Sequence, residues 1–130
     1  MRALQPADWA KPRGYSNGIE AKGRLIFVAG QIGWNKDSKF EHHDFRGQFE
    51  QALQNIVAVL AEAGAGPEHV TRLTWFITDK KAYLDQAKQV GEIYRRVMGR
   101  NFPTMSVVQV SALMEDDALV EIEATAVVPE

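Results

Sequence analysis

The C-terminal part of the chain constrains the fold most, because it holds two β-rich runs separated by a short acidic turn. Residues 106–112 and residues 119–128 are rich in Val and other residues that strands prefer. In the second run apolar side chains occupy alternate positions and share one face, whereas Glu121 and Glu123 lie on the other face. The pattern predicts two strands. The two acidic side chains then need water, a partner or a chemical task.

Two amphipathic segments and further β-like runs precede these strands. Apolar residues recur at helical spacing over residues 45–63 and again over residues 80–98. Asp44 and Asp79 precede these segments and are candidate N-caps. Strands are expected at residues 24–29 and 70–78, and a short β-like piece at residues 14–19. The predicted order is therefore β-β-α-β-α-β-β, which is a mixed α/β (α+β) class.

Residues 24–29 are apolar on both faces, which predicts a strand that is buried on both sides. Two helices of this size can cover only one face of the sheet. A sheet face that is apolar and not covered by helices predicts self-association. Residues 1–13 are polar and contain two prolines, so we expect an extended N-terminal arm. The whole chain, residues 1–130, fits one domain.

The composition of the chain argues against several kinds of site and partner. The chain has no cysteine, which excludes disulfides, thiolate metal sites and a cysteine nucleophile. His42 and His43 are adjacent and have no third ligand nearby, so we expect no metal site and no cofactor. The net charge of −2 argues against nucleic acid as a partner. No apolar run approaches the roughly 20 residues of a membrane helix. A cytoplasmic protein is therefore expected.

Three stretches together resemble the Rid (YjgF-type) family, which includes L-PSP endoribonuclease-like proteins. Residues 102–106 read Phe-Pro-Thr-Met-Ser, residues 120–124 read Val-Glu-Ile-Glu-Ala, and residues 27–33 read Phe-Val-Ala-Gly-Gln-Ile-Gly. The resemblance extends over residues 14–128. It implies a chorismate-mutase-like fold with two helices on one face of the sheet. It also implies a homotrimer around a central β-barrel, with small-molecule clefts between adjacent subunits.

The better-known branch of this family comprises deaminases of reactive enamines and imines. Tyr15, Gln31 and Glu121 match the family's pattern. Glu121 corresponds to the glutamate that is thought to position the attacking water in that branch. The resemblance therefore assigns catalytic roles to Glu121 and Tyr15.

Three other matched positions depart from that branch and are apolar here. Met105 replaces the arginine that holds the substrate's carboxylate, and a thioether cannot make the two parallel hydrogen bonds of a guanidinium. Ala29 replaces a serine, and Val107 replaces a cysteine or threonine. The resemblance thus implies a divergent member with a more hydrophobic pocket. Arg13 and Arg24, which lie close in sequence to two matched stretches, are the candidates to replace the missing charge.

These residues leave three functions open. The first is hydrolytic deamination of an enamine or imine with altered substrate preference, using Glu121 and Tyr15. The second is binding of a small hydrophobic metabolite without catalysis. The third is the ribonuclease or translation-inhibitor role of some family members, for which the acidic balance gives little support. The structural alternative is that Glu121 forms an ion pair at a subunit boundary and Tyr15 only packs. The substrate-binding residues for the first function are Met105, Ala29, Gln31 and Val107.

Overall fold

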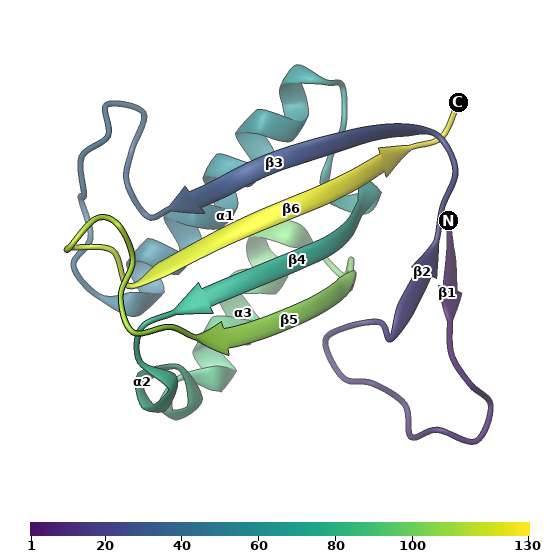
Figure 1. Cartoon of the computed structure of the whole chain (residues 1–130), viewed down its shortest axis with the longest axis horizontal. Helices are drawn as coiled ribbons and strands as arrows, with labels where there is room; N and C mark the ends of the chain where they lie inside the picture. The colour runs from purple at the N-terminus through teal and green to yellow at the C-terminus, as the bar shows by residue number, and fades with distance from the viewer.

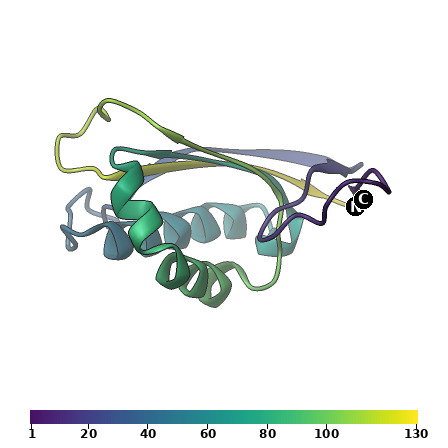
Figure 2. The ribbon, with the colours of Figure 1, turned by 90° about the horizontal axis from the view of Figure 1, so that it is seen from below.

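The computed structural model describes residues 1–130 and shows a four-stranded sheet with helices packed on one face (Figures 1 and 2). The mixed α+β class and the placement of the helices on a single face are confirmed. The strands of the sheet are β3 (Arg24–Ile32), β4 (Val70–Ile77), β5 (Thr104–Gln109) and β6 (Val120–Val128). The helices are α1 (Phe45–Glu62), α2 (Lys80–Asp85) and α3 (Ala87–Met98), with a short 3-10 helix at Pro67–His69.

The strand order in the sheet is β3-β6-β4-β5. β6 runs antiparallel to both of its neighbours, whereas β4 and β5 are parallel. β3 and β5 are therefore the two edges of the sheet. Three interstrand spacings separate them, or about 14 Å. Side chains on these two edges cannot meet on one small ligand within a single chain.

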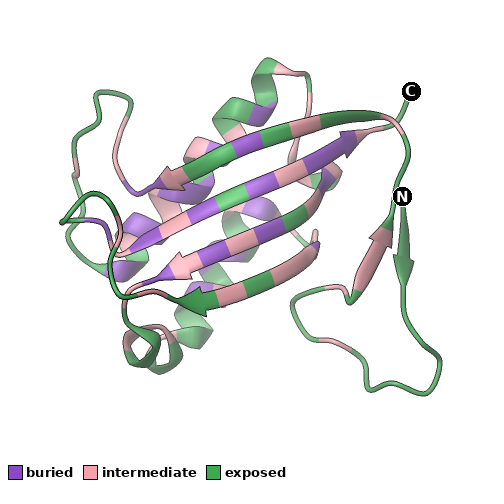
Figure 3. Ribbon diagram, viewed as in Figure 1, coloured by how far each residue is buried: buried purple, intermediate pink, exposed green.

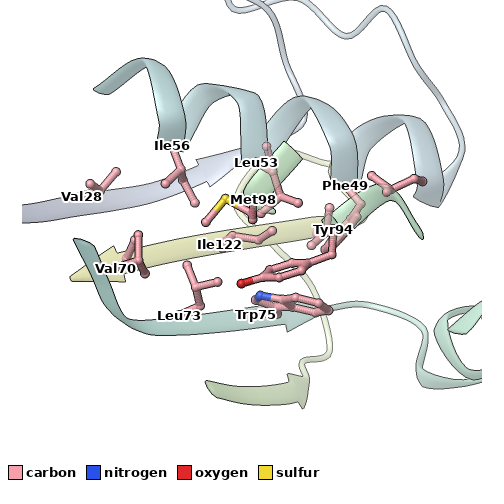
Figure 4. Close-up of a cluster of buried hydrophobic side chains, with 14 of the residues drawn as sticks. Val28, Phe49, Leu53, Ile56, Val70, Leu73, Trp75, Tyr94, Met98 and Ile122 are labelled. Carbon is pink, nitrogen blue, oxygen red and sulfur yellow. The ribbon is translucent and has the colours of Figure 1, made fainter. Parts of the chain in front are cut away.

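The hydrophobic core lies between the helices and the sheet (Figure 4). α1 contributes Phe49, Leu53 and Ile56, none of which is exposed. They face strand residues that alternate toward the helices, as the period of two along a strand requires. Other core residues labelled in Figure 4 are Val28, Val70, Leu73, Trp75, Tyr94, Met98 and Ile122.

One polar side chain, Gln48 of α1, is fully buried in this core at 0% exposure. Its amide nitrogen donates to the carbonyls of His42 at 3.1 Å and Asp117 at 2.9 Å. Its amide oxygen accepts from the backbone N–H of Leu119 at 2.8 Å. Gly33 packs directly on it, because a Cβ at that position would lie 2.5 Å from the Gln48 Cα. Gln48 therefore joins the loop before α1 to the loop between β5 and β6.

The second predicted helix is interrupted. α2 ends and α3 begins at Gln86, whose backbone (φ −117°, ψ 16°) is not helical. Its side-chain amide donates to the carbonyl of Ala82 at 2.9 Å and so satisfies an end group of α2. The predicted cap at Asp79 is confirmed, since its carboxylate accepts from the Ala82 N–H at 3.1 Å. Asp44 occupies the N-cap position of α1 but makes no capping hydrogen bond.

Two strand predictions need correction. The β-run predicted at residues 106–112 forms a strand at Thr104–Gln109, because it pairs in parallel with β4 directly after Pro103. The β-like piece predicted at residues 14–19 forms β2 (Gly18–Glu20), which pairs antiparallel with β1 (Arg2–Leu4) of the extended N-terminal arm.

The face of the sheet opposite the helices is open in the single chain (Figure 3). Leu25 and Phe27 of β3 are 62% and 73% exposed, and Val108 of β5 is also exposed. The prediction that residues 24–29 are buried on both sides is therefore wrong for the single chain. The reason is that all the helices pack on the other face. An apolar sheet face of this kind is typical of a surface that associates with another protein chain.

Candidate functional site

A cavity of about 380 Å³ opens on the helix side of the sheet, between β5, α3 and the loop before β2. Its volume is in the range of small-molecule pockets. Tyr15, Met105 and Val107 line it, so the structure brings three of the sequence-predicted residues together. Its other aromatic walls are Trp75, Tyr83, Tyr94 and Phe102.

The register of β5 places two of these residues. Met105 lies opposite Leu73 and Val107 lies opposite Trp75 of the neighbouring strand β4. Leu73 and Trp75 are buried under the helices, so Met105 and Val107 also face the helix side. β5 is an edge strand, and no further strand covers its outer side. Both side chains are therefore left half-buried in the pocket wall.

The loop before β2 brings Tyr15 to the rim of the pocket. The hydroxyl of Ser16 donates to the carbonyl of Phe102 at 2.6 Å, and its backbone N–H donates to the carbonyl of Pro103 at 3.0 Å. Gly14 has a φ of 76°, a conformation that glycine adopts without strain. Tyr15 remains 41% exposed at the rim.

The aromatic wall consists of contacting, uncharged rings. Tyr94 stacks on Phe102 with ring centroids 6.0 Å apart, and its hydroxyl donates to the carbonyl of Asn101 at 2.5 Å. Burial raises the pKa of Tyr94 and of Tyr83 above that of an ordinary phenol. Both therefore stay neutral at physiological pH. The indole N–H of Trp75 is buried and has no hydrogen-bond partner.

Glu121 lies in a different groove, of about 320 Å³, beside β3. Its carboxylate makes no ion pair within the chain. It lies directly over Gly30, where a Cβ would be 2.6 Å from the Glu121 Oε1. Gln31 lines the same groove, and its amide donates to the carbonyl of Ala29 at 3.1 Å across a β-bulge. The other residues of the groove are Ile32, Trp34, Leu113, Met114 and Glu115.

Ala29 itself lines a third hollow, on the open face of the sheet, together with Phe27 and Glu123. The six sequence-predicted residues thus occupy three places in one chain. Tyr15 lies beside β5 on the helix side of the sheet, whereas Glu121 lies on the inner strand β6 and faces away from the core residues Val120 and Ile122. Within one chain they do not form a single site.

Sequence reasoning missed the contribution of α3 to the pocket. Ala87, Gly91 and Arg95 line it, at intervals of four residues along one face of the helix. That spacing was the available signal, but Arg95 fits equally well on a solvated face. Of the two arginines considered as replacements for the charge absent at position 105, Arg13 lines the pocket. Arg24 instead donates to the carbonyl of Ala63 at 3.2 Å.

Two further observations concern other kinds of site. No group of three or more His, Cys, Asp or Glu side chains is placed to hold a metal ion. No helix of the structure combines the length and apolar character needed to cross a membrane.

Comparison with known proteins finds relatives that match nearly the whole chain. Residues 8–128 match the family model described as Endoribonuclease L-PSP. The RutC family protein UK114 of Drosophila melanogaster is 36% identical over 126 residues, which cover 96% of this chain and 88% of that protein. Escherichia coli TdcF, whose name describes it as a reactive intermediate deaminase, is 32% identical over 116 residues. These cover 87% of this chain and 85% of TdcF.

Solved structures agree with the sequence comparison. The Rid-family protein YyfB from Yersinia pestis superposes with a TM-score of 0.84 at 33% identity, covering 98% of each chain. E. coli TdcF, solved with bound serine, superposes with a TM-score of 0.69 at 28% identity. That match covers 98% of this chain and 99% of TdcF.

Proposed function

The chain belongs to the Endoribonuclease L-PSP (Rid/YjgF) family, and from this membership we propose that it hydrolytically deaminates a small reactive enamine or imine in a cleft between two copies of the chain. The observation that carries the proposal is the carboxylate of Glu121, which lies over Gly30 with no ion-pair partner. The relative TdcF is named for such an activity. The altered residues in the pocket support a substrate preference different from that of the arginine-bearing branch.

Strand order and the alternation of side chains are the reasons for placing the site between copies. Tyr15 lies beside β5 on the helix side of the sheet. Glu121 lies on β6, two interstrand spacings or about 10 Å from β5, and faces away from the core residues Val120 and Ile122. A homotrimer in which the β3 edge of one copy approaches the β5 edge of the next copy would bring them to one substrate. Exposed Leu25 and Phe27 supply apolar surface for this association.

The proposed reaction adds water to a C=N bond and releases ammonia. In an enamine, a proton first goes to the β-carbon and an iminium forms. Glu121 takes a proton from water, which attacks the iminium carbon. Glu121 then passes this proton to the nitrogen of the carbinolamine, the C–N bond breaks, and ammonia leaves. The hydroxyl group loses its proton to solvent as the carbonyl forms, which balances the proton that the enamine took up. Tyr15 donates a hydrogen bond to the substrate, while Met105 and Val107 contact its apolar part.

Release of keto acid from freshly generated 2-aminoacrylate tests the proposal. We expect native protein to exceed the buffer rate and Met105→Arg to be faster still. An arginine can hold the substrate's carboxylate with charge-assisted hydrogen bonds, each worth about 1.5–3 kcal/mol. That range corresponds to a gain of about 10- to 100-fold in kcat/KM. Met105→Gln has a side chain of similar length without the charge, and we expect no such gain.

The outcomes of this assay separate the candidate functions. Activity in Met105→Arg alone would mean that the catalytic framework is intact and that the natural substrate lacks this carboxylate. Absence of activity in both folded proteins would contradict the deaminase proposal. The second candidate, binding without turnover, is favoured by the apolar Met105 and Val107 in the pocket. It predicts a ligand-dependent rise in melting temperature with no product formed.

The apolar face of the sheet gives a separate prediction about assembly. We expect native protein to have about three chain masses by light scattering after gel filtration, and Phe27→Asp to be largely monomeric. The reason is that an unpaired charge would be buried in the interface. Val59→Asp places the same charge at an exposed apolar position on α1 and should leave the mass unchanged. A monomeric native protein, or a trimeric Phe27→Asp variant, would contradict the proposed interface.

A further inference from the structure

We propose that the helix-side pocket binds a carboxylate that carries an aromatic or similarly bulky apolar group, with Arg95 and Arg13 holding the carboxylate. This inference rests on the proposed function, because it names the substrate class of the same site. Arg13 comes from the loop before β2 and Arg95 from α3, yet both line the cavity of about 380 Å³. Together they offer the charge that Met105 cannot provide.

The charges around the pocket favour an anion. No Asp or Glu is among the lining residues. Neither Arg13 nor Arg95 has an ion-pair partner in the chain. By contrast Arg96, the next residue on α3, donates to the carboxylate of Glu50 at 2.9 Å. The pocket therefore carries two uncompensated positive charges in a chain whose net charge is −2. Two such charges beside apolar walls attract a negatively charged ligand.

The helix terminus offers a simpler explanation for Arg95. It lies in the last turn of α3, where a cation interacts favourably with the helix dipole. Arg96 shares that turn, but it points to Glu50 and not into the pocket. Arg96 therefore has the same benefit from the dipole and no access to a ligand. This difference makes it the matched control for Arg95.

Gly91 provides an independent observation. It lies in the middle of α3, where glycine is about 1 kcal/mol less favourable than alanine. A Cβ at this position would meet only the Nη1 of Arg95, at 3.4 Å. Core packing therefore does not require glycine here. Its missing side chain leaves space in the pocket wall beside the guanidinium of Arg95, which is where a bound carboxylate would lie.

The remaining walls suit the apolar part of the ligand. Trp75, Tyr83, Tyr94 and Phe102 present rings to the cavity, and Met105 adds a polarizable side chain that packs well on rings. The raised pKa values of the two tyrosines keep them neutral beside an anion. A small carboxylate such as propanoate would leave most of this surface without a contact.

Titration calorimetry with three probes tests the inference without any catalytic step. We expect 3-phenylpropanoate to bind native protein about tenfold more tightly than 3-phenylpropanamide, because only the acid pairs with the guanidinium groups. Propanoate should bind much more weakly than either. Arg95→Gln should remove most of the preference for the acid, and Arg95→Gln combined with Arg13→Gln should abolish it. Arg96→Gln should bind like native protein.

Gly91→Leu provides a second test. If Gly91 had only a structural role in α3, this substitution would not weaken binding of the probes. The added side chain fills the pocket while removing an unfavourable glycine from the helix. We therefore expect both aromatic probes to lose at least about tenfold in affinity, while the melting temperature is unchanged or raised.

Several results would overturn the inference. They are no binding of 3-phenylpropanoate, equal affinity for acid and amide, a preference that survives both arginine substitutions, and undiminished binding in Gly91→Leu. The deaminase proposal can fail independently. Acid-selective binding with no keto acid formed from any imine would leave the inference standing and favour a binding function. Turnover without arginine-dependent binding would instead support the deaminase proposal and overturn the inference.

Discussion

Gln48→Leu is expected to lower the free energy of unfolding by about 3 kcal/mol. The leucine has a similar volume, so the core stays filled. However, the N–H of Leu119 and the carbonyls of His42 and Asp117 lose their partner. A buried group that is left without a hydrogen bond costs about 1–3 kcal/mol, and these three are only partly buried. The melting temperature should fall by about 10 °C at a fixed protein concentration.

Gln54→Leu is the matched control, because Gln54 lies on the same helix with its side chain exposed. Its free energy of unfolding should change by less than about 0.5 kcal/mol. Urea unfolding of the two variants beside native protein provides the comparison. Equal stability of Gln48→Leu and native protein would show that water or a shifted backbone satisfies these groups. It would also remove Gln48 as the link between the loops beside the Glu121 groove.

Much of the fold was predictable because it depends on local periodicity. The helical spacing over residues 45–63 corresponds to α1 (Phe45–Glu62), and the alternation over residues 70–78 corresponds to β4 (Val70–Ile77). Leu73 and Trp75 face the core as alternation predicts. These features depend on which side chains share a face of a strand or helix. The sequence of that one segment is enough to predict them.

The incorrect predictions concern features that are determined by contacts between segments far apart in the sequence. The start of β5 at Thr104 depends on its parallel pairing with β4. The residues next to Thr104 in the sequence do not indicate this pairing. The break between α2 and α3 falls at Gln86, which is neither glycine nor proline. The exposure of Leu25 and Phe27 follows from all the helices packing on one face, as their number predicts. The apolar residues of 24–29 on both faces do not indicate which face the helices leave open.

The sequence predicted which residues belong to the candidate site, but it did not predict how they are arranged in space. The family pattern identified Tyr15, Met105 and Glu121, but Tyr15 lies beside β5 on the helix side of the sheet, whereas Glu121 lies on β6 and faces away from the core. The role of α3 was hidden for a different reason. A basic residue such as Arg95 on an amphipathic helix is typical of a solvated face, and only the position of β5 and the N-terminal loop turns that face into a pocket wall.

Glu121→Gln is expected to reduce kcat for imine hydrolysis by at least about 100-fold, because the amide keeps the shape of the side chain but cannot accept a proton from water. Glu123→Gln is the matched control, two residues along the same strand and on the same face. It should retain near-native turnover. Gly30→Ala should resemble Glu121→Gln, since a Cβ would lie 2.6 Å from the carboxylate and displace it. These comparisons need initial rates and light-scattering masses for each variant.

The mass measurement separates catalysis from a structural role. If Glu121 only forms an ion pair at a subunit boundary, Glu121→Gln should weaken the assembly and leave the turnover of assembled protein unchanged, which would contradict the proposal. Mixing the inactive variants Glu121→Gln and Tyr15→Ala, with dissociation and reassembly, completes the test. If each site combines Glu121 of one copy with Tyr15 of the next, about one quarter of the sites regain both residues. Activity should then rise well above that of either variant, whereas a site within one chain would give no gain.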